Sequence, residues 1–176
     1  STFQTGQVSL ERVEELLRRE PAIQSPVQPQ ELHRISRPGG IEAHDLHVRY
    51  EESSSDALKG LSFHVKPGEL VAVVGPVGCG KTTLARALGR MVEVPAGQLS
   101  IDGQDITALS LDDLRSKISL VPQEGYLFTA TLAENLRFGR PDATDSEMQQ
   151  AARQAQLEGD VQAFPNGYET LVGERG

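Results

Sequence analysis

The stretch Gly75-Pro76-Val77-Gly78-Cys79-Gly80-Lys81-Thr82 decides the fold of this chain. It matches the pattern G-x-x-x-x-G-K-[ST], the Walker A phosphate-binding loop, and is called the phosphate loop below. Its glycines let the backbone curl so that successive N–H groups point inward, toward phosphate oxygens. The stretch therefore predicts a binding site for the phosphates of a nucleotide.

The segments on either side of the phosphate loop support this interpretation. The apolar run Leu70–Val74 predicts a buried strand, and residues 83–88 predict the first turns of a helix. The positive end of such a helix adds to the attraction for phosphate. Lys81 would reach the β- and γ-phosphates, and the Thr82 hydroxyl would ligate Mg²⁺. A chance glycine turn is the alternative, and the strand–loop–helix context disfavours it.

Composition limits the classes of function. The chain has 176 residues, enough for one domain of ordinary size, and a formal net charge of −8. An acidic chain lacks the basic surface on which nonspecific nucleic-acid binding depends. The single cysteine, Cys79, excludes an internal disulfide and fits a reducing compartment. Because no signal peptide or membrane-spanning apolar run is visible, we expect a soluble or peripheral domain.

The first forty residues differ in pattern from the rest. Residues 1–19 predict an amphipathic helix, since apolar residues recur at helical spacing between charged ones. Residues 20–40 predict a linker, because four prolines interrupt regular structure and Gly39-Gly40 follows them. The globular part is expected to begin at Ile41.

Strand signals come next along the chain. Residues 41–50 alternate between apolar and polar side chains, with a slip at His44-Asp45 that predicts a bulge. Residues 57–65 predict a second strand, and residues 98–101 a short one that ends in a hairpin at Asp102-Gly103.

Later segments mix one strand with several helices. Ile118–Val121 predicts a strand, whereas residues 111–115, 131–138 and 144–157 predict helices. The last helix carries a capping box, formed by Thr144 and by a glutamate three residues later. The order of these elements indicates a nucleotide-binding α/β core with an antiparallel β element before it and helices after it.

In this order and spacing, the motifs resemble those of the nucleotide-binding domain of an ABC transporter of the exporter type. The resemblance implies an α/β fold: a P-loop NTPase core with an antiparallel β subdomain and the start of an α-helical subdomain, incomplete. It makes residues 1–19 the end of a transmembrane-domain helix, residues 20–40 its linker, and residues 41–176 the N-terminal part of the nucleotide-binding domain. Its four motifs are the phosphate loop, Tyr50, the Q-loop Val121-Pro122-Gln123 and the X-loop Leu171–Gly176.

The resemblance also implies ligands and site residues. It implies ATP and Mg²⁺, with Lys81 and Gln123 in catalysis and Thr82 and Gln123 as metal ligands. Tyr50 would stack on adenine, although a core aromatic at a strand end is the alternative. Without the resemblance, Gln123 reads as an exposed loop glutamine. The implied nucleotide-binding residues are Tyr50, Gly75, Pro76, Val77, Gly78, Cys79, Gly80, Lys81, Thr82 and Thr83.

Two positions depart from the family pattern. Val77 and Cys79 stand where many relatives have serine, but the loop binds through backbone N–H groups, so binding should survive. Cys79 lies beside a helix N-terminus, which favours the reactive thiolate, and we expect alkylation when nucleotide is not bound. A buried inert thiol is the alternative.

Several parts that hydrolysis needs do not occur in this sequence. The chain has no Asp-Glu dipeptide and no Ser-Gly-Gly, and all four histidines precede Lys81. In the family, such segments hold the metal, position the attacking water and stabilise the γ-phosphate. We therefore expect a fragment that is poorly stable and does not hydrolyse ATP alone, within an intact protein that is a transport-coupled ATPase.

The resemblance implies partners as well. A second nucleotide-binding domain would join in a homo- or heterodimer, and the transmembrane domain would contact the Gln123 loop and the Glu174 segment at the cytoplasmic face of a membrane. Otherwise Glu174 is a surface charge. Two alternatives stay open for the function: a non-hydrolysing half of a heterodimeric transporter, and an ABC-type ATPase that acts on DNA. The short segment after Gln123, which leaves no room for a long coiled coil, disfavours the second.

Overall fold

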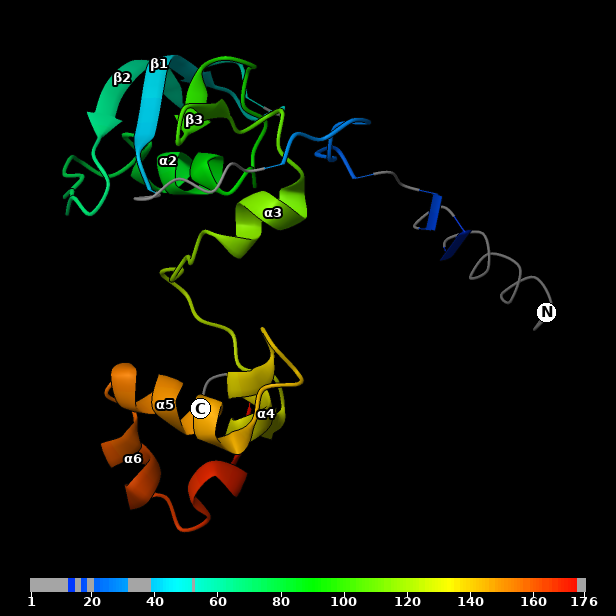
Figure 1. The fold of residues 1–176 in the computed structure, drawn as a ribbon, viewed down its shortest axis with the longest axis vertical. Coiled ribbons are helices and arrows are strands. Elements are labelled where there is room, and N and C mark those ends of the chain that lie inside the picture. The colour runs from blue at the N-terminus through cyan, green and yellow to red at the C-terminus, as the bar shows by residue number, and fades with distance from the viewer. Residues whose placement is uncertain (1–12, 15–16, 19–20, 32–38, 52, 174–176) are drawn as a thin grey trace. The chain divides into compact units, whose positions relative to one another are not determined.

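The computed structural model describes residues 13–14, 17–18, 21–31, 39–51 and 53–173 (Figure 1). The chain forms two compact units, residues 1–120 and residues 121–176. Most of the predicted helix over residues 1–19 lies outside the described residues, but its described positions are helical. Within the described part of the chain, no helix has the length and apolar character that crossing a bilayer demands.

The first unit is built on a four-stranded antiparallel sheet. Its strands are β1 (Ile41–Val48), β2 (Leu58–Val65), β3 (Leu99–Ile101) and β4 (Gln104–Asp105), in the order β2-β1-β3-β4. The strands predicted over residues 41–50, 57–65 and 98–101 are thus confirmed, with ends shifted by one or two residues.

The predicted bulge in β1 is also confirmed. The pairing of β1 with β2 passes from Ala43–Phe63 to Leu46–Leu61, and Asp45 between them has a φ of 48°. The extra residue brings both Ala43 and Leu46 to the buried face, with exposures of 1% and 0%. The bulge therefore keeps the apolar residues on both sides of His44-Asp45 on the same face of the sheet, although the alternation in the sequence is interrupted there.

Helix α2 (Lys81–Leu88) lies along one face of this sheet (Figure 1). Leu84 and Ala87 on α2 are buried in the same cluster as Leu46 and Leu99 of the sheet. Helix α3 (Leu111–Ser116) follows β4 and begins at Ser110, whose hydroxyl accepts a hydrogen bond from an amide of its first turn. The helix that carries the phosphate loop is thus held by the hydrophobic core.

The predictions of a buried strand at Leu70–Val74 and of a strand at Ile118–Val121 are wrong. Neither segment is a strand, and Leu70 and Val74 are 98% and 87% exposed. An apolar run becomes a strand only where another strand offers hydrogen-bonding partners along its length. None of the strands in the described part of the chain pairs with either segment.

The described part of the predicted linker follows the surface of the first unit. Residues 21–31 form no helix, and Gln30 makes a single parallel bridge to Leu109. The amide of Leu111 donates to the Ser25 hydroxyl at 3.0 Å. Beyond the undescribed residues, the amides of Gly39 and Gly40 both donate to the Asp102 carboxylate, at 2.8 and 2.9 Å.

The second unit is mainly helical. It contains β5 (Ala130–Thr131), α4 (Leu132–Arg137), α5 (Asp145–Gln154), α6 (Glu158–Ala163), the 3₁₀ helix η1 (Gly167–Glu169) and β6 (Leu171–Val172). Strands β5 and β6 pair antiparallel. The helix predicted over residues 131–138 is confirmed as α4, and its N-terminus has a complete capping box.

Helix α5 is confirmed but ends earlier than predicted. Gln156 has a φ of 59°, and its amide donates to the carbonyl oxygen of Arg153. The amide of Leu157 donates to the carbonyl oxygen of Ala152. This pair of bonds is a Schellman motif, which closes a helix through one left-handed residue. The sequence has no glycine at this position, which is the usual signal for such a helix end.

Candidate functional site

The phosphate loop leads directly into α2, and no side chain caps this helix. Gly80 is the N-cap residue with a φ of 94°, and Gly78 has a φ of 84°. Helices α3, α4 and α5 each begin with a serine or threonine side chain that accepts an amide hydrogen bond. The positive end of α2 is therefore left for another acceptor.

The backbone amides of the loop are correspondingly free. Among the residues that the structure describes, none accepts a hydrogen bond from the amides of Gly78, Gly80, Lys81, Thr82 or Thr83. Only Cys79 within this run donates, to the carbonyl oxygen of Pro76 at 3.4 Å. A set of convergent unpaired amides at a helix N-terminus fits a phosphate group.

Two glycines of the loop are needed for close packing. A Cβ atom on Gly80 would lie 2.6 Å from the carbonyl oxygen of Ala57 and 2.7 Å from Leu58 Cδ2. A Cβ atom on Gly75 would lie 2.6 Å from Cys79 Sγ. The start of β2 thus packs against the loop where a side chain would not fit.

Lys81 is half-buried and bonds to the loop itself. Its Nζ donates to the carbonyl oxygens of Gly75 and Pro76, both at 2.7 Å, and lies 3.6 Å from Cys79 Sγ. These bonds hold the ammonium group of Lys81 at the loop, where it and the amide N–H groups would attract the same anion. The Thr82 side chain is exposed at the start of α2, and Cys79 is an exposed free thiol.

Tyr50 packs against the phosphate-loop helix. Its ring is half-buried against the hydrophobic core, and its hydroxyl shares a 3.2 Å hydrogen bond with Thr83 Oγ1. This bond lowers the pKa of the Tyr50 hydroxyl, and Arg86 lowers it further. The predicted adenine-stacking residue and the predicted phosphate-binding segment are therefore in direct contact.

A cluster of charges holds the turn that follows Tyr50. Asp56 accepts a 2.6 Å hydrogen bond from Arg49 Nε and lies 3.1 Å from His47 Nδ1. Arg49 and His47 lower the pKa of Asp56, and the bond to Asp56 raises the pKa of His47. These contacts tie the turn back to the end of β1.

A cavity of about 730 Å³ adjoins the phosphate loop. Its lining includes Gly78, Lys81 and Leu58, together with the apolar Val73 and Val74. Its size is typical of a ligand site. Neither the Tyr50 ring nor the Thr82 hydroxyl lines it, so the unpaired amides define the phosphate site better than the cavity does.

The remaining predicted residues belong to the second unit. Gln123 is exposed in a segment without regular structure, and Glu174 lies outside the described residues. The structure therefore brings together Tyr50 and the loop residues 75–83 in the first unit. Gln123 belongs to the second unit. Mg²⁺ ligation by Thr82 and Gln123 stays a prediction.

Sequence reasoning missed two contributors to the site. Arg86 follows Thr83 by three residues, and this spacing places both on the side of α2 that faces Tyr50. That signal was available in the sequence. Ala57 limits the space at Gly80, but the sequence gave no signal of this, because the contact is made by a backbone carbonyl oxygen.

Comparisons with known proteins identify the family of the chain. The family model described as ABC transporter matches residues 58–173. A probable multidrug resistance ABC transporter ATP-binding/permease protein, YheI of Bacillus subtilis (strain 168), is 40% identical over 176 residues, which are 100% of this chain and 30% of that protein. The human ATP-binding cassette sub-family B member 6 is 39% identical over 179 residues, covering 99% of this chain and 20% of that protein.

A solved structure is similar too. The structure of a bacterial Atm1-family ABC exporter with ATP bound matches with a TM-score of 0.86 and 33% identity, covering 99% of this chain and 30% of that one. This chain thus spans less than a third of the length of these relatives. The α/β fold class predicted from the sequence is confirmed. The chain belongs to the ABC transporter family, and residues 58–173 are part of its nucleotide-binding domain.

Proposed function

We propose that this chain is the ATP-binding module of a membrane exporter, in which binding and hydrolysis of ATP drive export. The observation that carries the proposal is the run of unpaired amides at Gly78 and Gly80–Thr83, at the N-terminus of a helix that no side chain caps. Three further phosphate-directed features support it: the adjacent Lys81, the glycines that exclude side chains, and the ATP-bound exporter that the chain resembles.

Each residue of the site has a proposed role. The loop amides would bind the β- and γ-phosphates, and Lys81 would leave its carbonyl partners for the γ-phosphate oxygens. Thr82 and Gln123 carry the oxygen ligands that Mg²⁺ prefers, and the ion would neutralise charge on the phosphates. The Tyr50 ring would stack on adenine, which contributes about 1–3 kcal/mol.

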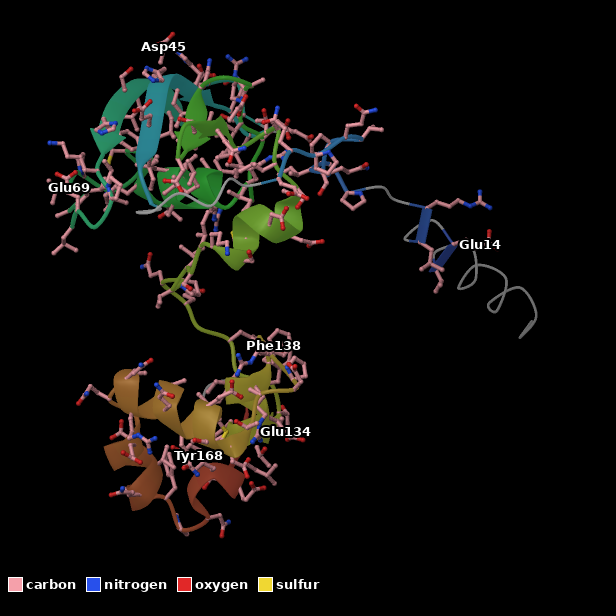
Figure 2. All side chains as sticks on the ribbon, viewed as in Figure 1. Glu14, Asp45, Glu69, Glu134, Phe138 and Tyr168 are labelled. Carbon is pink, nitrogen blue, oxygen red and sulfur yellow. The ribbon has the colours of Figure 1, made fainter. Side chains whose placement is uncertain are left out.

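The partners are proposed from the second unit. Three rings form an exposed cluster there: Tyr126 and Phe128 meet edge to face at 5.1 Å, and Phe128 stacks on Phe138 at 4.4 Å. The Phe138 side chain, 66% exposed, can be followed in Figure 2. Aromatic clusters of this kind are typical of protein interfaces. We propose that the transmembrane domain contacts this cluster, the Gln123 loop and the Glu174 segment at the cytoplasmic face.

A second ATP-binding module would complete the site. The present chain has neither the Asp-Glu nor the Ser-Gly-Gly segment that hydrolysis uses in this family. Those groups would come from elsewhere in the intact protein and from the second module.

The Lys81→Ala variant of the intact protein tests the proposal. ATP binding and ATPase activity are measured by calorimetry and by phosphate release. Lys66→Ala is the matched control, because Lys66 is an exposed lysine that does not line the cavity beside the phosphate loop. We expect Lys81→Ala to weaken ATP binding at least tenfold, about 1.4 kcal/mol, and the control to match the parent. Undiminished binding by Lys81→Ala would remove the basis of the proposal. Binding without phosphate release in the parent would identify the non-hydrolysing alternative.

A further inference from the structure

The hydrogen bond between Tyr50 and Thr83 links two parts of the site that are far apart in the sequence. Tyr50 follows β1, whereas Thr83 lies in the first turn of α2, and their oxygens are 3.2 Å apart. Thr83 is only 6% exposed, so its hydroxyl depends on a protein partner. Its side chain bonds to the tyrosine, although a threonine in a helix can bond instead to the carbonyl oxygen four residues earlier.

This bond restricts the Tyr50 ring. The side chain packs against the hydrophobic core, and the hydroxyl at its end is held by α2. A side chain fixed at both ends has little rotamer freedom left to lose when a ligand stacks on it. Because the partner is in the first turn of α2, the ring is also held at a set distance from the loop amides.

We infer that Thr83 is a positioning residue, whose hydroxyl pins the Tyr50 ring to α2 so that the base-binding and phosphate-binding parts of the site keep a fixed spacing. This inference rests on the proposed function and deepens it. It makes Thr83 a determinant of how strongly a nucleoside triphosphate is preferred over inorganic phosphate chains. The alternative is that the Thr83 hydroxyl serves the phosphates directly.

The two roles differ in which ligand binds more weakly when the hydroxyl is removed. A residue that positions Tyr50 contributes to ATP binding but not to the binding of inorganic tripolyphosphate, which has no base. A residue that contacts phosphate contributes to both. The informative quantity is therefore the selectivity, defined as the dissociation constant of tripolyphosphate divided by that of ATP.

The experiment measures this selectivity by calorimetry on the intact protein. The variants are Thr83→Val, Thr83→Ser, Tyr50→Phe and the double variant Thr83→Val/Tyr50→Phe. Thr107→Val is the control, because it removes the hydroxyl of a half-buried threonine of the same unit that makes no contact with Tyr50. Tyr50→Phe keeps the ring and removes only its half of the bond, so it tests the inference even where Thr83→Val impairs folding.

We expect Thr83→Val and Tyr50→Phe each to lower the selectivity by about two- to tenfold, the range for one hydrogen bond. The double variant should lose no more than either single variant, because the same bond is removed. Thr83→Ser should restore the parent selectivity. An unchanged selectivity in Tyr50→Phe, or losses that multiply in the double variant, would overturn the inference. If the parent protein bound neither ATP nor tripolyphosphate, that result would overturn the proposed function instead.

Discussion

Gly80 of the phosphate loop lies so close to Ala57 that a Cβ atom there would come within 2.6 Å of the Ala57 carbonyl oxygen. Gly80 also has a φ of 94°, which L-residues with side chains rarely adopt. Two independent constraints therefore require glycine. By comparison, Gly78 has a φ of 84° but nothing within 4 Å of its Cβ position, and Gly139 has neither constraint.

These three glycines give a graded prediction for substitution by alanine. We expect Gly80→Ala to destabilise the first unit by about 2–5 kcal/mol, because left-handed strain and steric overlap both contribute. Gly78→Ala should cost about 1–2 kcal/mol from the backbone alone, and Gly139→Ala should be nearly neutral. Denaturant unfolding of the intact protein, followed by hydrogen exchange in the unit that contains the substituted glycine, measures the order; Gly78 and Gly80 lie in the first unit and Gly139 in the second. Equal effects of Gly80→Ala and Gly78→Ala would contradict the steric part.

The capping box of α5 predicts a dependence on pH. The Thr144 amide and hydroxyl donate to the Glu147 carboxylate at 2.9 and 2.8 Å, and with Arg140 they lower the pKa of Glu147 from 4.5 to about 2. A carboxyl whose pKa falls on folding stabilises the fold above the unfolded value, and this contribution is lost as pH falls through the folded value. The stabilising effect is thus complete above pH 4.5 and gone near pH 2.

The Glu147→Gln variant isolates this charge. At pH 7 we expect the amides in the first turn of α5 to exchange faster in the variant than in the parent, after correction for intrinsic rates. The difference in exchange rate between variant and parent should narrow as the pH falls below 4.5. Asp142→Asn is the control, since Asp142 is exposed in the turn before α5. A difference that stays constant from pH 7 to pH 2.5 would show that the carboxylate charge has no part in it.

Cys79 is expected to report on occupancy of the phosphate loop. Its thiol is exposed, lies 3.6 Å from Lys81 Nζ, and follows Gly78 within the run of unpaired amides. Bound ATP should cover it, so we expect iodoacetamide to modify Cys79 several times more slowly in saturating Mg·ATP. Mass spectrometry of the peptide that contains Cys79 measures the rate. In Lys81→Ala the protection should be lost at the same ATP concentration, and equal rates with and without ATP in the parent would argue against the placement.

The exposed aromatic cluster predicts a coupling defect without a binding defect. We expect Phe138→Ala to weaken the contact with the transmembrane domain by roughly tenfold, a typical cost for truncating an aromatic anchor. ATP affinity should stay at the parent value, because Phe138 is not among the residues that we propose to bind ATP or Mg²⁺. Substrate-stimulated ATPase activity in proteoliposomes measures the coupling. Phe164→Ala is the control, since Phe164 is an exposed aromatic of the same unit outside the cluster. Parent-like stimulation in Phe138→Ala would count against this interface.

Features that depend on neighbouring residues could be predicted from the sequence. The phosphate loop, the cap at Thr144 and the bulge in β1 each depend on side chains within a few positions. Local hydrogen bonds and side-chain spacing decide such features, so a single sequence contains the information.

Features that depend on distant partners could not. The apolar runs at residues 70–74 and 118–121 predicted strands, yet hydrophobicity specifies a preference for burial and does not supply the second strand that a ladder requires. Likewise, the contacts of Tyr50 with Thr83 and of Gly80 with Ala57 join positions separated by 33 and 23 residues. The amino-acid order alone determined that a phosphate-binding loop exists here and which glycines form it. Only the packing of α2 on the antiparallel sheet decided what holds that loop in place, because long-range contacts are set by how the core closes.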